Sequence, residues 1–425
     1  MTSLASQFGG HDAYDPNALP VELGRRLILD AVEPVGGIEH IPLRDALGRV
    51  LAEPVVSPID VPAHDNSAMD GYGLCYADLA ADGDTTLSVI GTAFAGQPFD
   101  GALQPGQAVR IMTGARLPAG VDTVVMQEVV RAADGRVTVP PGQRCGQNLR
   151  RAGEDLRAGL AALPAGRLIR PAELGLVASL GIGSVAVRRR LRVAFFSTGD
   201  EVVNVGTPAG DGQIYDSNRY TLFGMLSRLG FDIIDIGVIR DDPETLETTL
   251  RDAASIADAV ITSGGVSVGE ADFTREVMAR LGEVLFWKIA MKPGRPMAFG
   301  RIGGHGSDAA WLFGLPGNPV AVMVTFYQFA RPALLRLAGV DPVAEPALLG
   351  VPCATPIRKA PGRTEYLRGV LFQDGGQWQV RSTGAQGSGI LSSMADANCL
   401  IVLGPAQGNV AAGDTVQVQV LDGLV

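Results

Sequence analysis

Residues 191–340 alternate between short apolar runs and amphipathic stretches, and this alternation restricts the fold more than any other feature of the chain. Four apolar runs have the length and composition of buried strands, and each precedes a stretch with the pattern of a helix. The predicted pairs of strand and helix are 191–196 with 218–229, 231–239 with 243–257, 259–262 with 273–281, and 311–315 with 319–337. Such alternation is typical of a parallel sheet with helices on both faces. We therefore expect a central, doubly wound α/β domain whose ligands bind at the carboxyl ends of the strands.

The segments on either side of this region are richer in strand-like patterns. Residues 61–150 alternate apolar and polar side chains between Gly and Pro turns, which predicts an inserted, lid-like β-rich domain. Residues 1–60 and 151–190 then form one discontinuous N-terminal α+β domain, with residues 1–20 as a disordered or loosely packed tail. Residues 345–425 are β-rich again and predict a small C-terminal β-barrel domain. A chain of 425 residues is long enough for these four domains.

Four polar loops follow the predicted strands and should meet at the carboxyl edge of the sheet. They are residues 197–201, 240–243, 263–272 and 314–319, and together they carry six carboxylates. Crowded carboxylates repel one another unless a cation lies among them. Mg²⁺ usually takes one or two carboxylates and completes its coordination with water and phosphate oxygens. The sequence therefore predicts a Mg²⁺ site beside an anionic substrate.

Several residues of these loops also have a purely structural interpretation. Asp242 and Asn318 each precede a proline that can begin a helix, and Asp272 precedes a predicted helix, so all three are N-cap candidates. The glycines after residue 263 are compatible with a simple tight turn, and the loop lacks the Lys-Ser/Thr pair of a P-loop. The better ligand candidates, which have no capping geometry, are Glu201, Asp241 and Glu270.

Lysine is used very sparingly in this chain. Of 35 basic residues only three are lysine, and two of these, Lys288 and Lys292, lie four positions apart in a segment with two prolines. Lysine presents a compact point charge that arginine does not reproduce. We interpret the pair as a site for anions, although ordinary surface cations are the alternative.

The overall composition excludes several other functions. A net charge of −10 without a long basic run argues against nucleic-acid binding, so an anionic substrate must be bound by local positive charge. The four Cys and four His are isolated and share no zinc-ligand spacing. No signal-peptide pattern and no long apolar stretch is present, so we expect a cytoplasmic protein with no membrane span.

Two segments outside the α/β region are further candidates. Residues 65–73 form a long polar loop in an apolar neighbourhood, for which an Asx-turn connector is the alternative interpretation. Arg363 and Ser388 could bind a small oxyanion, because arginine suits planar or tetrahedral oxyanions. The alternative is an arginine at a strand edge with a serine in a turn.

Taken in order, these motifs resemble the MoeA-type molybdopterin molybdenumtransferases, the family that includes the E domain of gephyrin. The resemblance covers about residue 20 to 425 and rests on segments 65–72, 110–115, 148–155, 197–201, 212–218, 263–272, 288–296 and 314–319. It implies four domains per protomer and an elongated homodimer. The active site is then expected between the α/β domain of one protomer and the first two domains of its partner.

The resemblance also implies a reaction, in which molybdenum from molybdate enters adenylylated molybdopterin and AMP is released, with Mg²⁺ required. It implies that Glu201, Asp241 and Asp272 contact the metal and the nucleotide, and that Lys288 and Lys292 bind anions. Substrate is then bound by Ser263, Gly264, Gly265 and Ser267, and the floor of the site is formed by Pro316 and Pro319. The partner subunit contributes Asp70, Thr113 and Asp155, and molybdate is bound by Arg363 and Ser388.

Two rival functions share parts of this pattern. Molybdopterin adenylyltransferase has the same α/β domain but normally lacks the flanking domains, and it is also a possible partner of the protein. A non-catalytic scaffold, like gephyrin in receptor clustering, usually carries additional linker and trimerising domains.

Overall fold

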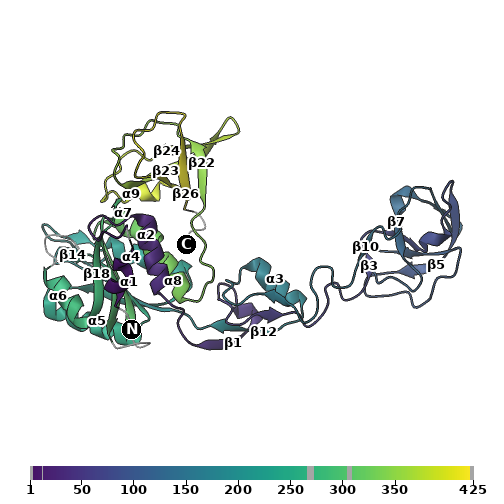
Figure 1. The fold of residues 1–425 in the computed structure, drawn as a ribbon, viewed down its shortest axis with the longest axis horizontal. Helices are drawn as coiled ribbons and strands as arrows, with labels where there is room; N and C mark the ends of the chain where they lie inside the picture. The colour runs from purple at the N-terminus through teal and green to yellow at the C-terminus, as the bar shows by residue number, and fades with distance from the viewer. Residues whose placement is uncertain (1–2, 12, 266–271, 304–308, 422–425) are drawn as a thin grey trace. The chain divides into compact units, whose positions relative to one another are not determined.

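The computed structural model describes residues 3–11, 13–265, 272–303 and 309–421. The chain divides into two compact units. Unit 1 consists of Met1–Ala52, Gly166–Arg170 and Ala186–Val425, and unit 2 of Glu53–Ala165 and Pro171–Val185. Both units are built on sheets of six strands (Figure 1).

The central sheet of unit 1 has the strand order β16-β13-β17-β21-β20-β18. Its strands are β13 (Arg192–Thr198), β16 (Asp232–Ile239), β17 (Ala259–Ser263), β18 (Gly282–Lys288), β20 (Pro296–Gly303) and β21 (Ala309–Leu315). The first four in spatial order run parallel, as predicted, but β20 is antiparallel to both β21 and β18. The four predicted strands are therefore parallel neighbours, and the sheet carries two further strands, β18 and β20, that the sequence did not predict. The connections around β20 are too short for the helical crossover that parallel neighbours require.

Helices cover both faces of this sheet. They are α4 (Ser217–Arg228), α5 (Pro243–Ile256), α6 (Asp272–Leu281), α7 (Pro319–Thr325) and α8 (Arg331–Leu337), with a π-helical turn, Phe326–Ala330, between the last two. Alternate residues of β13 enter different cores, because successive strand side chains point to opposite faces. Ala194 and Phe196 pack with α5 and α6, whereas Val193 and Phe195 pack with α4, α7 and α8. The apolar runs of the sequence are thus strands buried on both faces.

The N-terminal segment is more ordered than predicted. Residues 4–9 form α1 (Leu4–Gly9), which Ser3 caps by accepting a hydrogen bond from the amide of Ser6. Leu4 and Phe8 are buried, and the ring of Phe8 lies 5.9 Å from that of Trp287 on β18. The expectation of a loose tail was wrong for this part, because two apolar side chains four positions apart are enough to bury one face of a short helix. The next helix, α2 (Val21–Ala31), packs on the same core.

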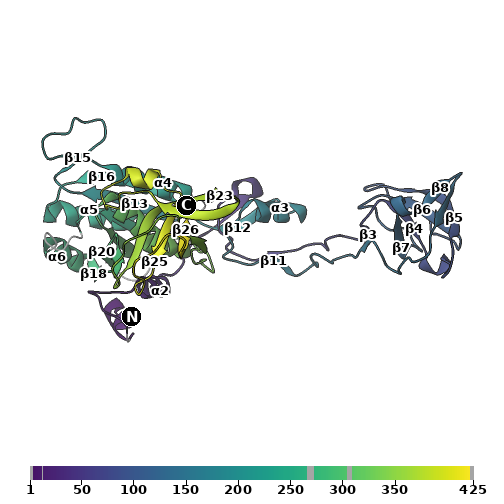
Figure 2. The ribbon, with the colours of Figure 1, turned by 90° about the horizontal axis from the view of Figure 1, so that it is seen from above.

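The C-terminal part of unit 1 is a second sheet, with strand order β19-β23-β25-β26-β22 and β24 paired with β23. Its strands are β19 (Met291–Lys292), β22 (Leu348–Pro352), β23 (Thr364–Asp374), β24 (Gln377–Ser382), β25 (Cys399–Leu403) and β26 (Thr415–Val420). The short helix α9 (Ser392–Ala395) precedes β25. Parallel pairing of β19 with β23 joins this sheet to the segment that follows β18. Figure 2 labels β23, β25 and β26 of this sheet.

Unit 2 contains the sheet β7-β4-β6-β5-β9-β8. Its strands are β4 (Gly71–Leu74), β5 (Thr85–Ala93), β6 (Gln107–Ile111), β7 (Thr123–Met126), β8 (Arg131–Ala133) and β9 (Arg136–Val139). Two-stranded pairs are formed by β2 (Val55–Val56) with β11 (Ala161–Leu163) and by β3 (Asn66–Ser67) with β10 (Leu149–Arg150). The helix α3 (Pro171–Ser179) begins at the predicted proline. The remaining regular elements of the described residues are β1 (Ile38–Pro42), β12 (Ser184–Arg188), β14 (Val202–Val203), β15 (Ile214–Tyr215) and three short 3-10 turns.

None of the helices in the described residues has the length and apolar character that crossing a membrane requires.

Candidate active site

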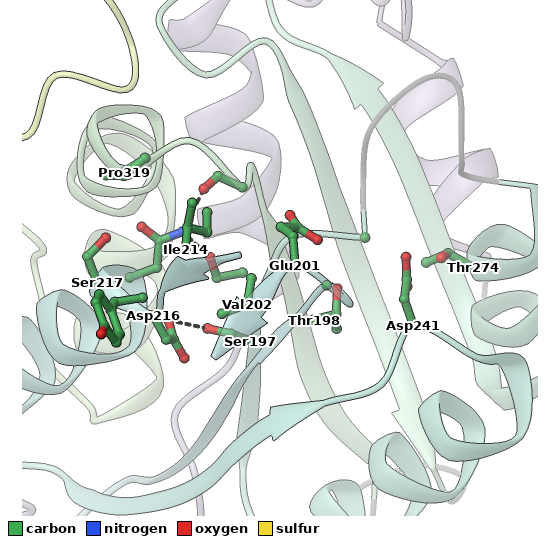
Figure 3. Close-up of a pocket in the computed structure, with 17 residues that line it drawn as sticks. Ser197, Thr198, Glu201, Val202, Ile214, Asp216, Ser217, Asp241, Thr274 and Pro319 are labelled. Atoms are coloured by element: carbon green, nitrogen blue, oxygen red, sulfur yellow. Dashed lines mark hydrogen bonds between the residues drawn. The ribbon is translucent and has the colours of Figure 1, made fainter. Parts of the chain in front are cut away.

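A pocket of about 150 Å³ opens at the carboxyl ends of the parallel strands (Figure 3). All four loops predicted to meet at this edge contribute to it. The lining residues are Ser197, Thr198, Gly199, Glu201, Val202, Ile214, Tyr215, Asp216, Ser217, Asn218, Asp241, Ser263, Gly264, Gly265, Thr274, Gly317 and Pro319. The loops that follow four parallel strands and the first turns of three helices therefore line one polar cavity.

Glycine is required where the chain leaves β17. Gly264 and Gly265 have φ values of +95° and +69°, which side-chain-bearing residues rarely adopt. A Cβ atom at residue 264 would also lie 2.7 Å from the carbonyl oxygen of Thr198 at the end of β13. The two strand ends can therefore approach closely only because these residues lack side chains.

The start of α4 supplies a network of buried polar groups. Asp216 is the N-cap of this helix, and one of its carboxylate oxygens accepts hydrogen bonds of 3.0 Å from the Ser197 hydroxyl and the Arg219 amide. The amide group of Asn218 donates to the Ser263 hydroxyl (2.8 Å) and to the Gly317 carbonyl (2.6 Å). These bonds connect α4 to the ends of β13, β17 and β21. Sequence reasoning did not select Asp216 or Asn218, although a polar run directly before a helix was a visible signal.

Two of the three predicted metal ligands line this pocket. Glu201 follows β13, and Asp241 follows β16, with its amide donating to a carboxylate oxygen of Asp200 at 3.3 Å. Figure 3 shows both carboxylates at the same end of the pocket, beside Thr198 and Thr274. The loops that follow the neighbouring strands β13 and β16 thus each place one acidic side chain in the same pocket.

The third predicted ligand, Asp272, is the first residue of α6, and its side chain lies outside the described ones. Ser267 and Glu270 lie outside the described residues as well. Among the side chains that the structure describes, no three acidic, His or Cys residues form a complete metal site.

The described donors match what a hard divalent cation prefers. Oxygens of Thr198, Asp216 and Asn218 in the pocket lining are buried and accept or donate no hydrogen bond within the described structure. Buried polar atoms are rarely left without partners unless water, an ion or a ligand binds there. Together with the carboxylates of Glu201 and Asp241, they make the pocket lining rich in oxygen atoms, the ligand type that Mg²⁺ prefers.

The two N-cap candidates with known side chains behave differently. Asp242 caps α5 and accepts a hydrogen bond of 2.9 Å from the Thr245 amide, which confirms the structural interpretation. Hydrogen bonds from the side chain and amide of Thr245 lower the pKa of Asp242. Asn318 occupies the N-cap position of α7, but its side chain forms no capping hydrogen bond.

The two predicted anion-binding lysines lie near the junction of the two sheets and do not line the pocket in the described structure. Lys288 ends β18 and is partly buried, with its carbonyl bonded to the Leu19 amide at 3.1 Å. Lys292 lies on β19, and its ammonium is 3.6 Å from a carboxylate oxygen of Glu365. A segment around Gly294 packs tightly on α7, since a Cβ there would meet the Thr325 hydroxyl at 2.4 Å.

The remaining predicted residues of unit 1 lie around the start of α7 and in the C-terminal sheet. Pro319 is the first residue of α7 and lines the pocket, whereas Pro316 is buried just before it. Arg363 is exposed in the turn before β23. Ser388 is partly buried, and its carbonyl accepts a hydrogen bond of 3.0 Å from the Val320 amide of α7. The loop that carries Ser388 is thus docked beside Pro319.

The residues predicted in unit 2 form a separate local arrangement. One carboxylate oxygen of Asp70 accepts hydrogen bonds of 2.7 Å from both the amide and the hydroxyl of Thr113. These bonds, the amide one foremost, lower the pKa of Asp70. Asp155 is exposed, and its amide donates to the Val61 carbonyl at 3.0 Å. The structure therefore brings Asp70 and Thr113 together, while Asp155 lies on another loop of the unit.

Three family profiles match the chain in succession. They are the MoeA N-terminal region (domain I and II) over residues 19–181, the probable molybdopterin binding domain over residues 194–336, and the MoeA C-terminal region (domain IV) over residues 350–421. A curated relative, the molybdopterin molybdenumtransferase of Haemophilus influenzae, is 45% identical over 389 residues, which are 91% of this chain and 95% of the relative. The chain belongs to the MoeA family.

Other members of the MoeA family extend this similarity. The molybdopterin molybdenumtransferase of a Nostoc species is 38% identical over 89% of this chain and 88% of its own length. Among solved structures, the molybdopterin biosynthesis moeA protein of Pyrococcus horikoshii OT3 matches with a TM-score of 0.78 and 28% identity, covering 95% of this chain and all of that chain. The multidomain, mixed α/β and sheet-rich architecture described above is therefore that of the MoeA family.

Proposed function

We propose that the protein is a molybdopterin molybdenumtransferase, which inserts molybdenum from molybdate into adenylylated molybdopterin and releases AMP during molybdenum cofactor biosynthesis. The observation that carries this proposal is the position of the pocket. Every residue that lines it falls within residues 194–336, the segment that matches the molybdopterin binding domain. Curated relatives of nearly the same length bear the name of this activity.

In the proposed reaction, Glu201, Asp241 and Asp272 hold Mg²⁺. The metal supplies charge neutralisation for the phosphate oxygens when a phosphoanhydride bond is cleaved. The oxygen-rich lining of the pocket supports this assignment. The protein's own contribution is to hold the substrate in a fixed place, since no covalent nucleophile is needed for such a transfer.

The other site residues divide by the part of the substrates that they contact. Ser263, Gly264, Gly265 and Ser267 bind adenylylated molybdopterin at the end of β17, and Pro316 and Pro319 form the floor. Lys288 and Lys292 bind anionic groups through their point charges. Arg363 and Ser388 bind molybdate, a role supported by the docking of the Ser388 carbonyl on α7 next to the pocket.

The proposal includes an assembly and an architecture. The protein acts as a homodimer, in which Asp70, Thr113 and Asp155 of one protomer complete the site of the other, and it receives its substrate from the molybdopterin adenylyltransferase. Each protomer has four domains: 1–60 with 151–190, 61–150, 191–340 and 345–425. The third is doubly wound, and the fourth is a small β-barrel.

We also propose that the reaction takes place in the cytoplasm. All four cysteines are free thiols, which is the usual state of cysteine in a reducing compartment.

The decisive experiment measures AMP release from adenylylated molybdopterin by the purified protein, with molybdate and Mg²⁺ added or omitted. We expect release to require both ions and the product to activate a molybdenum-free apoenzyme. Asp241→Asn and Asp272→Ala should each reduce AMP release by roughly a hundredfold or more while leaving the protein folded, because each removes a charge from the metal site.

Asp252→Asn is the matched control, since Asp252 is an exposed aspartate on α5. It should retain the wild-type rate. Adenylylation of molybdopterin from ATP without molybdate would instead favour the adenylyltransferase, and substrate binding without turnover would favour a scaffold. Near-normal turnover by the Asp272 variant would remove that residue from the mechanism.

A further inference from the structure

A fully buried arginine lies in the C-terminal sheet and has no acidic partner among the described residues. Arg368 on β23 is 0% exposed. Burial lowers the pKa of its guanidinium, and no carboxylate of the described residues acts against this effect. A buried charge is costly unless other polar groups satisfy it. The hydrogen-bond partners of the Arg368 guanidinium therefore indicate the role of this residue.

The guanidinium is satisfied by one loop and one hydroxyl. It donates to three successive backbone carbonyls, those of Ala385 (3.2 Å), Gln386 (3.2 Å) and Gly387 (2.9 Å). Its Nε donates to the hydroxyl of Ser393 at 2.9 Å. A single side chain thus fixes the direction of three consecutive peptide groups.

The loop holds Arg368 in return. The side-chain oxygen of Gln386 accepts a hydrogen bond of 2.9 Å from the Arg368 amide, and its nitrogen donates to the Arg368 carbonyl at 3.1 Å. Each residue therefore binds the main chain of the other. This reciprocal arrangement defines one conformation of loop 385–388.

The direction of these carbonyls determines where the amides of the loop point. In a trans peptide the C=O and the following N–H point in opposite directions, and the cis peptides of the chain lie elsewhere. The amides of Gln386, Gly387 and Ser388 therefore point away from the guanidinium. None of the three donates a hydrogen bond to any group in the described structure. Successive outward amides form a concavity that binds anions.

The same loop lies at the edge of the candidate active site. The Ser388 carbonyl accepts a hydrogen bond from the Val320 amide in the first turn of α7, directly after Pro319 in the pocket lining. The loop is thus fixed at both ends, by Arg368 in the sheet and by α7 at the pocket.

We propose that Arg368 is a positioning residue, which holds loop 385–388 so that three backbone amides face the tetrahedral oxyanion consumed in the reaction. The inference rests on the proposed function, in which the side chains of Arg363 and Ser388 bind molybdate. It predicts that Arg368 determines the affinity for molybdate and has little influence on cleavage of the phosphoanhydride or on binding of adenylylated molybdopterin.

The test compares the steady-state kinetics of Arg368→Met with those of the wild type. The KM for molybdate should rise about tenfold or more, equivalent to the loss of one strong hydrogen bond. The KM for adenylylated molybdopterin and kcat at saturating molybdate should stay unchanged. Arg368→Lys should be intermediate, because an ammonium keeps the charge but has too few donors for the four acceptors.

Arg381→Met is the matched control. Arg381 is exposed on β24 of the same sheet, so this variant removes an equal charge without touching the loop. It should leave the KM for molybdate unchanged. An equal rise in both methionine variants would mean that long-range charge alone attracts molybdate, which would overturn the role of Arg368 in positioning.

Two further measurements keep the inference testable. If Arg368→Met fails to fold, Gln386→Ala tests the inference in its place. This variant keeps the guanidinium and removes the hydrogen bonds between the Gln386 side chain and the Arg368 main chain. Its KM for molybdate should rise, while its KM for adenylylated molybdopterin stays unchanged. Equilibrium dialysis with molybdate alone tests the loop even if the wild type releases no AMP, a result that would defeat the proposed function. Unchanged molybdate affinity in a folded variant, or equal losses for both substrates, would overturn the inference.

Discussion

At the residue scale, one strongly perturbed carboxylate lies outside the candidate active site and has a structural role. Asp258 precedes β17 at the amino edge of the central sheet, and its side chain is only 9% exposed. Arg189 donates two hydrogen bonds of 2.7 Å to its two carboxylate oxygens, and the amide and guanidinium of Arg192 donate two more. Burial alone raises the pKa of Asp258, but these bonds outweigh it and lower the pKa to about 2.

This pairing makes stability depend on acid pH. A carboxyl group whose pKa falls from 3.8 to about 2 on folding contributes roughly 2 kcal/mol to the free energy of unfolding at neutral pH. The contribution is complete above the unfolded pKa and is lost as the pH falls through the folded one. Asp258→Asn should therefore lower the free energy of unfolding by about that amount at neutral pH, as measured by urea denaturation.

The difference between Asp258→Asn and the wild type should shrink from about pH 4 to pH 2, as the pKa values of the two states require. Asp252→Asn serves here too and should change stability little at any pH. A constant difference down to the lowest pH would show that lost packing, not lost charge, destabilises the variant.

At the element scale, the turn after β17 controls how closely two strand ends approach. Gly264 combines a positive φ with a position against the Thr198 carbonyl, so any side chain there strains the backbone and separates β17 from β13. The lining of the pocket depends on this approach, since Ser263, Gly264 and Thr198 all contribute to it.

Gly264→Ala should therefore reduce kcat/KM for AMP release by roughly 10- to 100-fold, because displacement of a positioning element by even an ångström is costly to catalysis. Gly224→Ala provides the comparison. Gly224 is exposed in α4, and a Cβ there meets no atom within 4 Å, so this variant should keep full activity and gain about 0.5–1 kcal/mol of stability. Full activity of Gly264→Ala would mean that the two strand ends need not be so close.

The sequence was informative wherever an element is buried on both faces or has a distinct end. The strands β13, β16, β17 and β21 and the helices α4 and α5 lie within one or two residues of their predicted limits. The antiparallel strands β18 and β20 were not recognised, because glycines and prolines interrupt the apolar pattern around them. The helix α1 is too short to show a period. The helix predicted at 319–337 is broken by a π-helical turn that no pattern announces.

The part of the site formed by loops directly after the parallel strands could be predicted from the sequence. Parallel strands bring the loops containing Glu201, Asp241 and Gly264 to one edge, and this follows from the alternation alone. Asp216 and Arg368 were not predicted, because their roles depend on partners that lie far away in the sequence. Buried arginine is rare enough that sequence reasoning assigns arginine to the surface by default.

At the scale of the whole molecule, the proposed site draws on both units. Asp241 belongs to unit 1 and Asp70 to unit 2. In the proposed homodimer, each active site takes the first from one protomer and the second from the other. A homodimer of either variant therefore has two inactive sites. A mixed dimer, with one subunit of each variant, keeps one site in which both residues are intact.

Mixing the inactive variants Asp241→Asn and Asp70→Ala should restore activity. Equal amounts that exchange subunits at random give about half mixed dimers, so about a quarter of the wild-type rate of AMP release is expected. Labelled subunits should be followed in parallel to prove that exchange took place. Complete exchange without recovery would contradict a site shared between protomers and would place both residues in one chain's site.

The division of the chain also bears on how its parts can be separated. The backbone passes between unit 1 and unit 2 four times, after Ala52, Ala165, Arg170 and Val185. Neither unit is one uninterrupted stretch of sequence. A single proteolytic cut at one of these crossings therefore leaves both pieces of the chain as parts of the same unit, and no complete unit is released. Terminal truncation cannot excise unit 2 alone, and engineers who wish to transplant it must graft an internal insert, with both of its ends rejoined to a host.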